Sequence, residues 1–478
     1  MTKQTIAKNT TYLTLAYIGQ KILAFVYFVL IARFIGVEDL GKYTFALSFT
    51  TMFAVFIDFG LSSALIRESA KSFDKTSKYL SSILTSKSIL AILSYLVVIL
   101  VINLMGYPPI TKNLVYLSGL LMMLDSFTLS FWGVFRGGQN LKYEAFSIVI
   151  SQVVVVLSGA YVLLTHQSLM FLMLPLLAGG LFNFVYSSIM VRRKLNVRYC
   201  WKFDPEILKF LFKIALPFAL IAIFSRIYGN IDSVLLSYLK GDAAVGFYQT
   251  AMKVPFALQF IPSAFAAAIF PAFSYYFVHD KAKLKFSFDK AMLLLTIFVV
   301  PISFGLLSLS DEVIPMLFGQ QFINSVLTLK ILVFGLIFVF LNFPLGALLN
   351  GCDKQVTNTK LVGLVMALNI ILNLIFIPQY SYIGAAAVFL VCHALLFLIS
   401  LFVARKIIPY SRRNLILVFA KTILSAVIMT IAVLYLKQSM NLVLVMVIGA
   451  IIYIGVLYLV KGFSRQDMTY LKQSMLRK

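Results

Sequence analysis

Long apolar segments recur from one end of this chain to the other, and they constrain its fold more than any other feature. Each runs for about 20 residues without the alternation of polar and apolar side chains that marks a barrel strand. A helix of that length crosses the hydrocarbon core of a bilayer with its backbone groups bonded internally. The composition agrees, since 61% of the 478 residues are hydrophobic and only 12% are charged. We therefore predict an all-α polytopic membrane protein.

Fourteen transmembrane helices are expected when each crossing takes about 20 apolar residues. Their approximate ranges are 12–35, 41–66, 82–105, 112–135, 143–165, 168–191, 209–239, 245–273, 287–310, 323–349, 356–378, 382–405, 415–436 and 440–461. The connections between these ranges are short. The sequence therefore predicts no domain outside the membrane.

The basic residues predict the orientation of these helices. When the N-terminus is placed inside, Lys and Arg gather in every second connection, and the most basic connection is VRRKLNVRYCWKFDP at 191–205. Cytoplasmic loops carry an excess of Lys and Arg, so both termini are expected in the cytoplasm. The net charge of +24 then reflects topology, and no nucleic-acid partner is expected.

A short motif, Gly-x4-Gly-x-Tyr, occurs twice between expected helices. It begins at Gly36 after the first helix and at Gly241 after the seventh, 205 positions later. The same offset at corresponding junctions predicts two six-helix lobes related by a pseudo-twofold repeat, as in several transporter classes. We expect an N-terminal lobe at residues 1–203, a C-terminal lobe at 204–408, and two further helices with a cytoplasmic tail at 409–478.

One arginine, Arg226, lies near the middle of the seventh expected helix. A charge at mid-bilayer costs about 3 kcal/mol or more unless it faces water or a partner, so it indicates a functional site. The repeat offset pairs it with Lys21 in the first helix, which gives each half one cation at an equivalent place. These cations either meet an anion or are paired structurally, and Asp58 lies at a depth from which it could neutralise Lys21.

Two more aspartates lie within expected helices. Asp232 is six residues from Arg226, so the two side chains do not share a helix face. Asp232 instead matches the depth of Lys253 and Lys330. Asp125, in LMMLDSF of the fourth helix, is interpreted equally well as a carrier of a coupling proton or as the partner of a cation.

Several kinds of site find no support in the sequence. No Gly-x4-Gly-Lys-Ser/Thr phosphate loop occurs, so ATP hydrolysis by this chain is not expected. The three cysteines and three histidines show no spacing typical of metal ligands. No nucleophile stands beside a base in a recognisable pattern. We expect no enzymatic activity, no cofactor and no metal.

An ordered set of motifs resembles one family over nearly the whole chain from the first to the twelfth helix. The stretches are ARFIGVEDLGKYTFALSF, DFGLSSALIRESAK, FRGGQNLKYEA, NIDSVLLSYLKGDAAVGFYQTAMKVPFALQFIP, FPAFS, LNGCDKQ and LNIILNLIFIPQYSYIGAAAV. In order and spacing they resemble the polysaccharide exporters of the multidrug, oligosaccharidyl-lipid and polysaccharide superfamily, and most of all the O-antigen and capsule repeat-unit flippases.

The resemblance implies a flippase that works by alternating access in the inner membrane of a bacterial cell. Its cargo would be an oligosaccharide on polyprenyl diphosphate, moved from the cytoplasmic to the outer leaflet. Cavity cations would then bind the diphosphate, and the candidates are Arg226, Lys21, Lys253 and Lys330. The candidate acids for coupling to H+ or Na+ are Asp125, Asp232 and Asp58. Membrane lipid, a polysaccharide polymerase and chain-length proteins are the other partners implied.

Three alternatives remain open at this point. A cation-coupled drug exporter of the same superfamily would favour cavity carboxylates, whereas here lysines and arginine compete with the aspartates. A peptidoglycan-precursor flippase would need a similar cationic cavity. A membrane glycosyltransferase or ligase acting through Glu38 and Asp39 would need a large outer loop, and the expected outer connections are too short.

Overall fold

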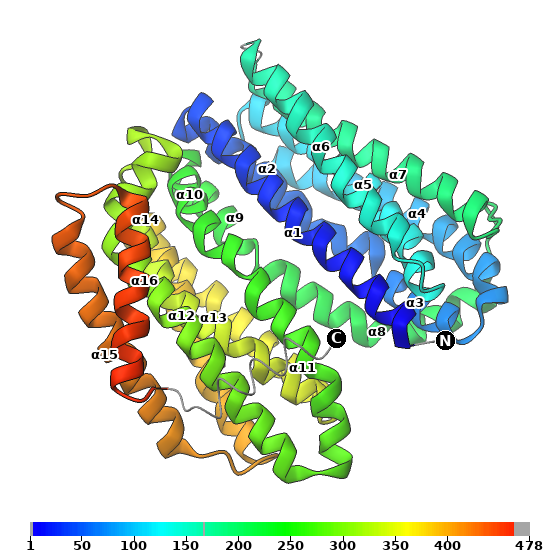
Figure 1. Cartoon of the computed structure of the whole chain (residues 1–478). Coiled ribbons are helices and arrows are strands. Elements are labelled where there is room, and N and C mark those ends of the chain that lie inside the picture. The colour runs from blue at the N-terminus through cyan, green and yellow to red at the C-terminus, as the bar shows by residue number, and fades with distance from the viewer. Residues whose placement is uncertain (1–2, 166–167, 463–478) are drawn as a thin grey trace. The chain divides into compact units, whose positions relative to one another are not determined.

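The computed structural model describes residues 3–165 and 168–462 (Figure 1). These residues form sixteen α-helices and no strand. The helices are α1 (Lys3–Phe34), α2 (Val37–Asp58), α3 (Leu61–Lys71), α4 (Thr76–Leu104), α5 (Pro109–Gly137), α6 (Lys142–Leu164), α7 (Met173–Lys194), α8 (Pro205–Tyr228), α9 (Ile231–Lys240), α10 (Asp242–Leu258), α11 (Phe260–His279), α12 (Lys281–Phe318), α13 (Ser325–Gly351), α14 (Gln355–Arg405), α15 (Arg412–Leu436) and α16 (Leu442–Leu459). The expected all-α polytopic architecture is confirmed.

Thirteen helices of the described residues are long and apolar enough to cross a membrane. One of them, α14, has 51 residues, far more than the roughly 20 that one crossing takes. Inside α14, Ser381 has φ 53° and ψ −135°, so the backbone leaves the helix there. α14 therefore holds both the eleventh and the twelfth expected helices, 356–378 and 382–405, and fourteen crossings result.

The second expected helix is broken into α2 and α3. Phe59 and Gly60 have positive φ angles of 43° and 75°, which ends α2 at Asp58. Gly60 is required for a second reason, because a Cβ there would lie 2.6 Å from the carbonyl oxygen of Ala215 on α8. Asp58 then accepts a hydrogen bond from the backbone N–H of Ser62 (3.3 Å) at the start of α3. The break thus places a carboxylate at a free helix N-terminus.

The seventh expected helix is also broken, into α8 and α9, around Gly229 and Asn230. Arg226 lies in the last turn of α8, where the partial negative charge of a helix C-terminus favours a cation. The side chain of Asn230 donates to the carbonyl of Arg226 (2.8 Å). The break therefore supplies both a favourable field for the arginine and a donor for a freed carbonyl.

The helices group into two compact units, the first made of Met1–Lys253 with Met366–Ala385 and the second of Val254–Val365 with Ala386–Lys478. In the first unit α5 packs against α2, α3, α4 and α7, while α1 packs along α6 (Figure 1). In the second unit α12 packs against α13 and α15, and α15 packs against α16. Each unit holds its own buried apolar cluster.

The Gly-x4-Gly-x-Tyr motif has a reciprocal packing role in the first unit. A Cβ at Gly41 would lie 1.8 Å from the carbonyl oxygen of Asp242, and a Cβ at Gly246 would lie 2.1 Å from that of Val37. Val37 and Asp242 are themselves 205 positions apart, so the two contacts are equivalent under the repeat. The glycines let the first turns of α2 and α10 touch backbone to backbone.

The tyrosines of the motif are equivalent in the same way. The Tyr248 hydroxyl donates to Asp232 (2.8 Å), and Tyr43 faces Tyr27, which precedes Asp232 by the same 205 positions. The sequence repeat is therefore also a repeat of contacts. The lobe boundaries expected from it remain a prediction.

Candidate functional site

The candidate site is built from charged side chains of α1, α2, α5, α8, α9 and α10, all in the first compact unit. Lys253 on α10 lies close enough to Lys21 on α1 for the charge of Lys21 to act on it. The Nζ atom of Lys253 also lies over the ring of Phe28, 4.7 Å from its centroid, a position in which the aromatic face attracts a cation. Two ammonium groups thus converge inside a membrane-spanning region.

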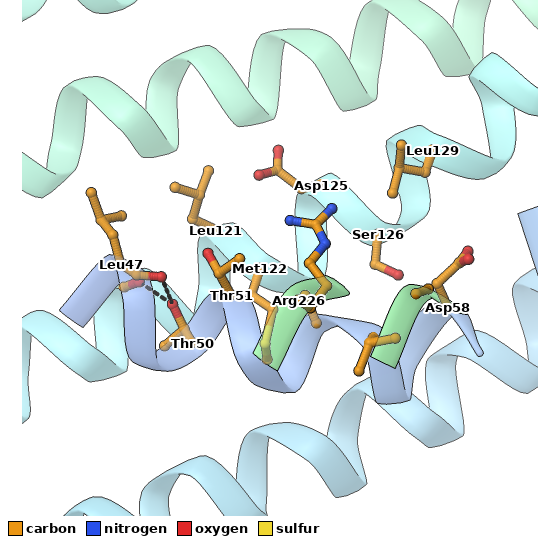
Figure 2. Close-up of a pocket in the computed structure, with 14 residues that line it drawn as sticks. Leu47, Thr50, Thr51, Asp58, Leu121, Met122, Asp125, Ser126, Leu129 and Arg226 are labelled. Atoms are coloured by element: carbon orange, nitrogen blue, oxygen red, sulfur yellow. Dashed lines mark hydrogen bonds between the residues drawn. The ribbon is translucent and has the colours of Figure 1, made fainter. Parts of the chain in front are cut away.

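Arg226 lies in a pocket of about 150 Å³ between α2, α5 and α8. The other lining residues are Leu47, Thr50, Thr51, Ala54, Val55, Asp58, Ser118, Leu121, Met122, Asp125, Ser126, Leu129 and Ala222. Figure 2 shows the guanidinium of Arg226 directed toward the carboxylate of Asp125. Both side chains are exposed. Of the two interpretations of Asp125, the structure favours the one in which it faces a cation.

Asp58 has a different partner from the one expected. Its carboxylate lies 2.5 Å from the Nζ of Lys87 on α4 and accepts from the Ser62 hydroxyl at 2.5 Å. Lys87 is fully buried and also donates to the carbonyl of Ser126 (2.7 Å). The expected neutralisation of Lys21 by Asp58 is therefore wrong. The third helix is expected at 82–105, whereas α4 begins at Thr76 and carries Lys87 into the bundle.

Asp232 is buried in a cluster of neutral polar groups. It accepts hydrogen bonds from the Tyr248 hydroxyl (2.8 Å) and from the side-chain amide of Asn373 on α14 (2.7 Å). The Asn373 amide also donates to the Oδ1 atom of Asn369 (3.1 Å), while its own Oδ1 is buried without a hydrogen-bond partner. The cluster therefore presents several oxygen atoms around one carboxylate.

The hydrogen bonds of this cluster correct the pairing of Asp232 with Lys253 or Lys330 that its depth suggested. Asp232 bonds to neutral side chains, and Lys330 instead contacts Asp311 on α12 at 2.8 Å. Sequence reasoning missed the two asparagines of LNIILNL. Their i, i+4 spacing places both amides on one face of an apolar helix, and that was the available signal.

The acids in the first turns of α2 and α10 are structural. Glu38 and Asp39 in the first turn of α2 both contact the Nζ of Lys42 at 3.0 Å. Asp242, in the first turn of α10, accepts from Ser237 (2.5 Å). Acids in the first turn of a helix complement its dipole, which accounts for these three residues.

Comparison with known proteins agrees with this architecture. The model of the polysaccharide biosynthesis protein family matches residues 6–277, and the MatE family model matches residues 217–375. The capsular polysaccharide biosynthesis protein CapF of Staphylococcus aureus is 24% identical over 80% of this chain and 94% of its own length. A putative O-antigen transporter of Shigella flexneri is 25% identical over 80% of this chain and 93% of its own.

A solved structure shares the fold. The lipid II flippase MurJ, in an inward closed conformation, superposes with a TM-score of 0.76 over 94% of this chain and 98% of its own, at 20% identity. The matched residues 6–277 of the polysaccharide biosynthesis family model make up more than half of the chain's 478 residues. They include both copies of the glycine motif as well as Lys21, Arg226 and Lys253. The chain belongs to the polysaccharide biosynthesis protein family.

Proposed function

We propose that this chain is a flippase for an oligosaccharide linked to polyprenyl diphosphate, which it moves from the cytoplasmic to the outer leaflet by alternating access. The observation that carries the proposal is that Lys253 of α10 lies with its Nζ atom over the ring of Phe28 on α1, the helix that also carries Lys21, within membrane-spanning helices. A phosphate group would attract both ammonium groups, and attraction between opposite charges is strong in a medium of low dielectric. A diphosphate offers several oxygens and more than one negative charge to such a pair.

The names of the relatives support the same cargo class. A capsule biosynthesis protein and a putative O-antigen transporter are similar to this chain over most of their lengths. We place the protein in the bacterial inner membrane with both termini cytoplasmic, where a polysaccharide polymerase and chain-length proteins are its proposed partners. Its work is transport, with no covalent change to the cargo.

The repeat suggests how the cycle is arranged. We propose lobes at residues 1–203 and 204–408 with an added pair of helices at 409–478. The backbone contact of Gly41 with Asp242, and of Gly246 with Val37, lies at the outer ends of α2 and α10. We propose that this contact closes the outer side while cargo enters from the cytoplasm.

The Asp232 cluster is the proposed coupling site. Its carboxylate is buried and bonded to neutral donors, and no cation of residues 3–165 or 168–462 forms a salt bridge with it. A proton or Na+ would neutralise it, and the oxygen of Asn373 that lacks a partner could join the carboxylate as a Na+ ligand. Asp232→Asn is expected to leave cargo binding intact and to abolish any dependence of transport on the ion gradient.

A drug exporter of the same superfamily is the second candidate, because the MatE family model matches residues 217–375. Such a pump needs an acid that is free to meet a cationic drug. Here Asp58 contacts Lys87 and Asp125 faces Arg226, which disfavours a cationic cargo. A flippase for a peptidoglycan precursor shares the cationic requirement and differs in the sugar.

The test is retention of cargo by the purified full-length protein, measured by native mass spectrometry. Wild type should retain a polyprenyl-diphosphate oligosaccharide in preference to a cationic dye, and Lys21→Ala/Lys253→Ala should lower that retention by about tenfold or more, since a charge-assisted bond contributes about 1.5–3 kcal/mol. Lys283→Ala, which removes an exposed lysine at the start of α12, is the matched control. Preference for the dye in wild type would reject the proposal in favour of the drug exporter.

A further inference from the structure

The pocket between α2, α5 and α8 contains Arg226, a cation to which the proposed function has given no role so far. Two carboxylates line this pocket with Arg226. Asp58 already contacts Lys87 at 2.5 Å and Ser62 at 2.5 Å. Asp125 is the acid toward which the guanidinium is directed (Figure 2). Asp58 therefore already has a cation as its partner, and Asp125 is the acid of this pocket that faces Arg226.

This arrangement matters because a carrier passes through an empty state in every cycle. A guanidinium deep in the membrane is costly unless an anion compensates it. Carboxylates and phosphates both bind a guanidinium through the same planar fork of N–H donors. Asp125 and a phosphate group are therefore alternative ligands for one set of donors on Arg226.

We propose that Asp125 is a built-in competitor of the cargo diphosphate for Arg226. It holds the arginine in the empty carrier, gives it up when the phosphate binds, and takes it back as the cargo leaves. The inference rests on the proposed function and adds a residue that sets cargo affinity. Transport requires binding that is strong enough to load and weak enough to release, and an internal carboxylate lowers affinity without removing the cation.

The test uses farnesyl diphosphate as the probe and the purified full-length protein, with affinity measured by native mass spectrometry. Asp125→Asn should tighten binding by about tenfold, a size usual for coupling between two ligands of one site. Arg226→Ala should weaken binding, and Asp125→Asn/Arg226→Ala should bind as weakly as Arg226→Ala alone. The control is Asp280→Asn, an acid-to-amide change at the N-cap of α12, where asparagine also caps.

The outcomes separate this inference from the proposed function. Failure of wild type to bind farnesyl diphosphate better than farnesol would overturn both. If wild type binds the probe and Arg226→Ala leaves that binding unchanged, the competition alone is overturned. The same holds if Asp125→Asn leaves binding unchanged or weakens it. Should Asp125→Asn fail to fold, Asp125→Ser provides the same loss of charge. A flipping assay gives a second readout, because tighter binding in Asp125→Asn should slow release and lower the turnover rate.

Discussion

At the scale of single residues, the sequence located the charges but not their partners. The depths of Lys21, Arg226 and Asp125 followed from counting along helices, and the structure places all three in membrane-spanning segments. The contact of Asp58 with Lys87 joins helices α2 and α4, and that of Asp232 with Asn373 joins residues 141 apart. Such contacts depend on helix rotation and packing, which depth along one helix does not specify.

The ion pair of Asp58 and Lys87 gives a prediction on stability. Lys87→Met leaves the Asp58 carboxylate, whose side chain is 20% exposed, without its fully buried cation, and breaking a buried pair destabilises by up to about 3–5 kcal/mol. Asp58→Asn/Lys87→Met should recover most of that loss, because no isolated charge remains. The thermal midpoint of the purified protein in detergent measures both effects.

Lys78→Met is the control for this pair, because Lys78 is an exposed lysine of the same helix. It should leave the midpoint unchanged within error. A midpoint for Lys87→Met equal to that of Lys78→Met would show that the buried pair does not stabilise the fold.

At the scale of elements, apolar length predicted the helices, and local backbone conformation decided where they break. The expected spans are present, yet the second and seventh are divided at Phe59–Gly60 and at Gly229–Asn230. Hydropathy averaged over a whole crossing does not register such breaks, since most residues on both sides are apolar. The glycine motif was visible in the sequence, but the backbone contact that it permits required the structure.

The contact between α2 and α10 gives a prediction for the motif glycines. A methyl group at Gly41 would lie 1.8 Å from the Asp242 carbonyl, and one at Gly246 would lie 2.1 Å from that of Val37, so the helices must separate. Overpacking of this kind destabilises by about 1–3 kcal/mol. Gly41→Ala and Gly246→Ala should each lower the thermal midpoint and the rate of flipping, and by similar amounts because the sites are equivalent.

Gly36→Ala is the control from the same motif, since a Cβ at Gly36 meets no atom within 4 Å. It should retain wild-type flipping and midpoint. Wild-type behaviour of Gly41→Ala would mean that the two helix starts are not held together during transport.

At the scale of the whole molecule, the distribution of charge along the chain, and not its total, predicts the orientation in the membrane. The net charge of +24 is spread so that alternate connections are basic, which predicts cytoplasmic termini. The three natural cysteines allow this orientation to be tested by thiol labelling of the wild-type protein. Cys200 is exposed in the connection between α7 and α8, while Cys352 and Cys392 are buried.

A membrane-impermeant maleimide should therefore leave wild type unlabelled in intact spheroplasts and label it once, at Cys200, in inverted vesicles. Cys352 lies on the same predicted side but should stay unreactive near neutral pH, because burial raises the pKa of its thiol to about 11 and the thiolate is the reacting form. Cys200→Ser/Glu38→Cys supplies the opposite control, since position 38 is exposed at the predicted outer start of α2 and should react in intact spheroplasts. Labelling of wild-type Cys200 in intact spheroplasts would reverse the orientation, and cargo would then load from the other face.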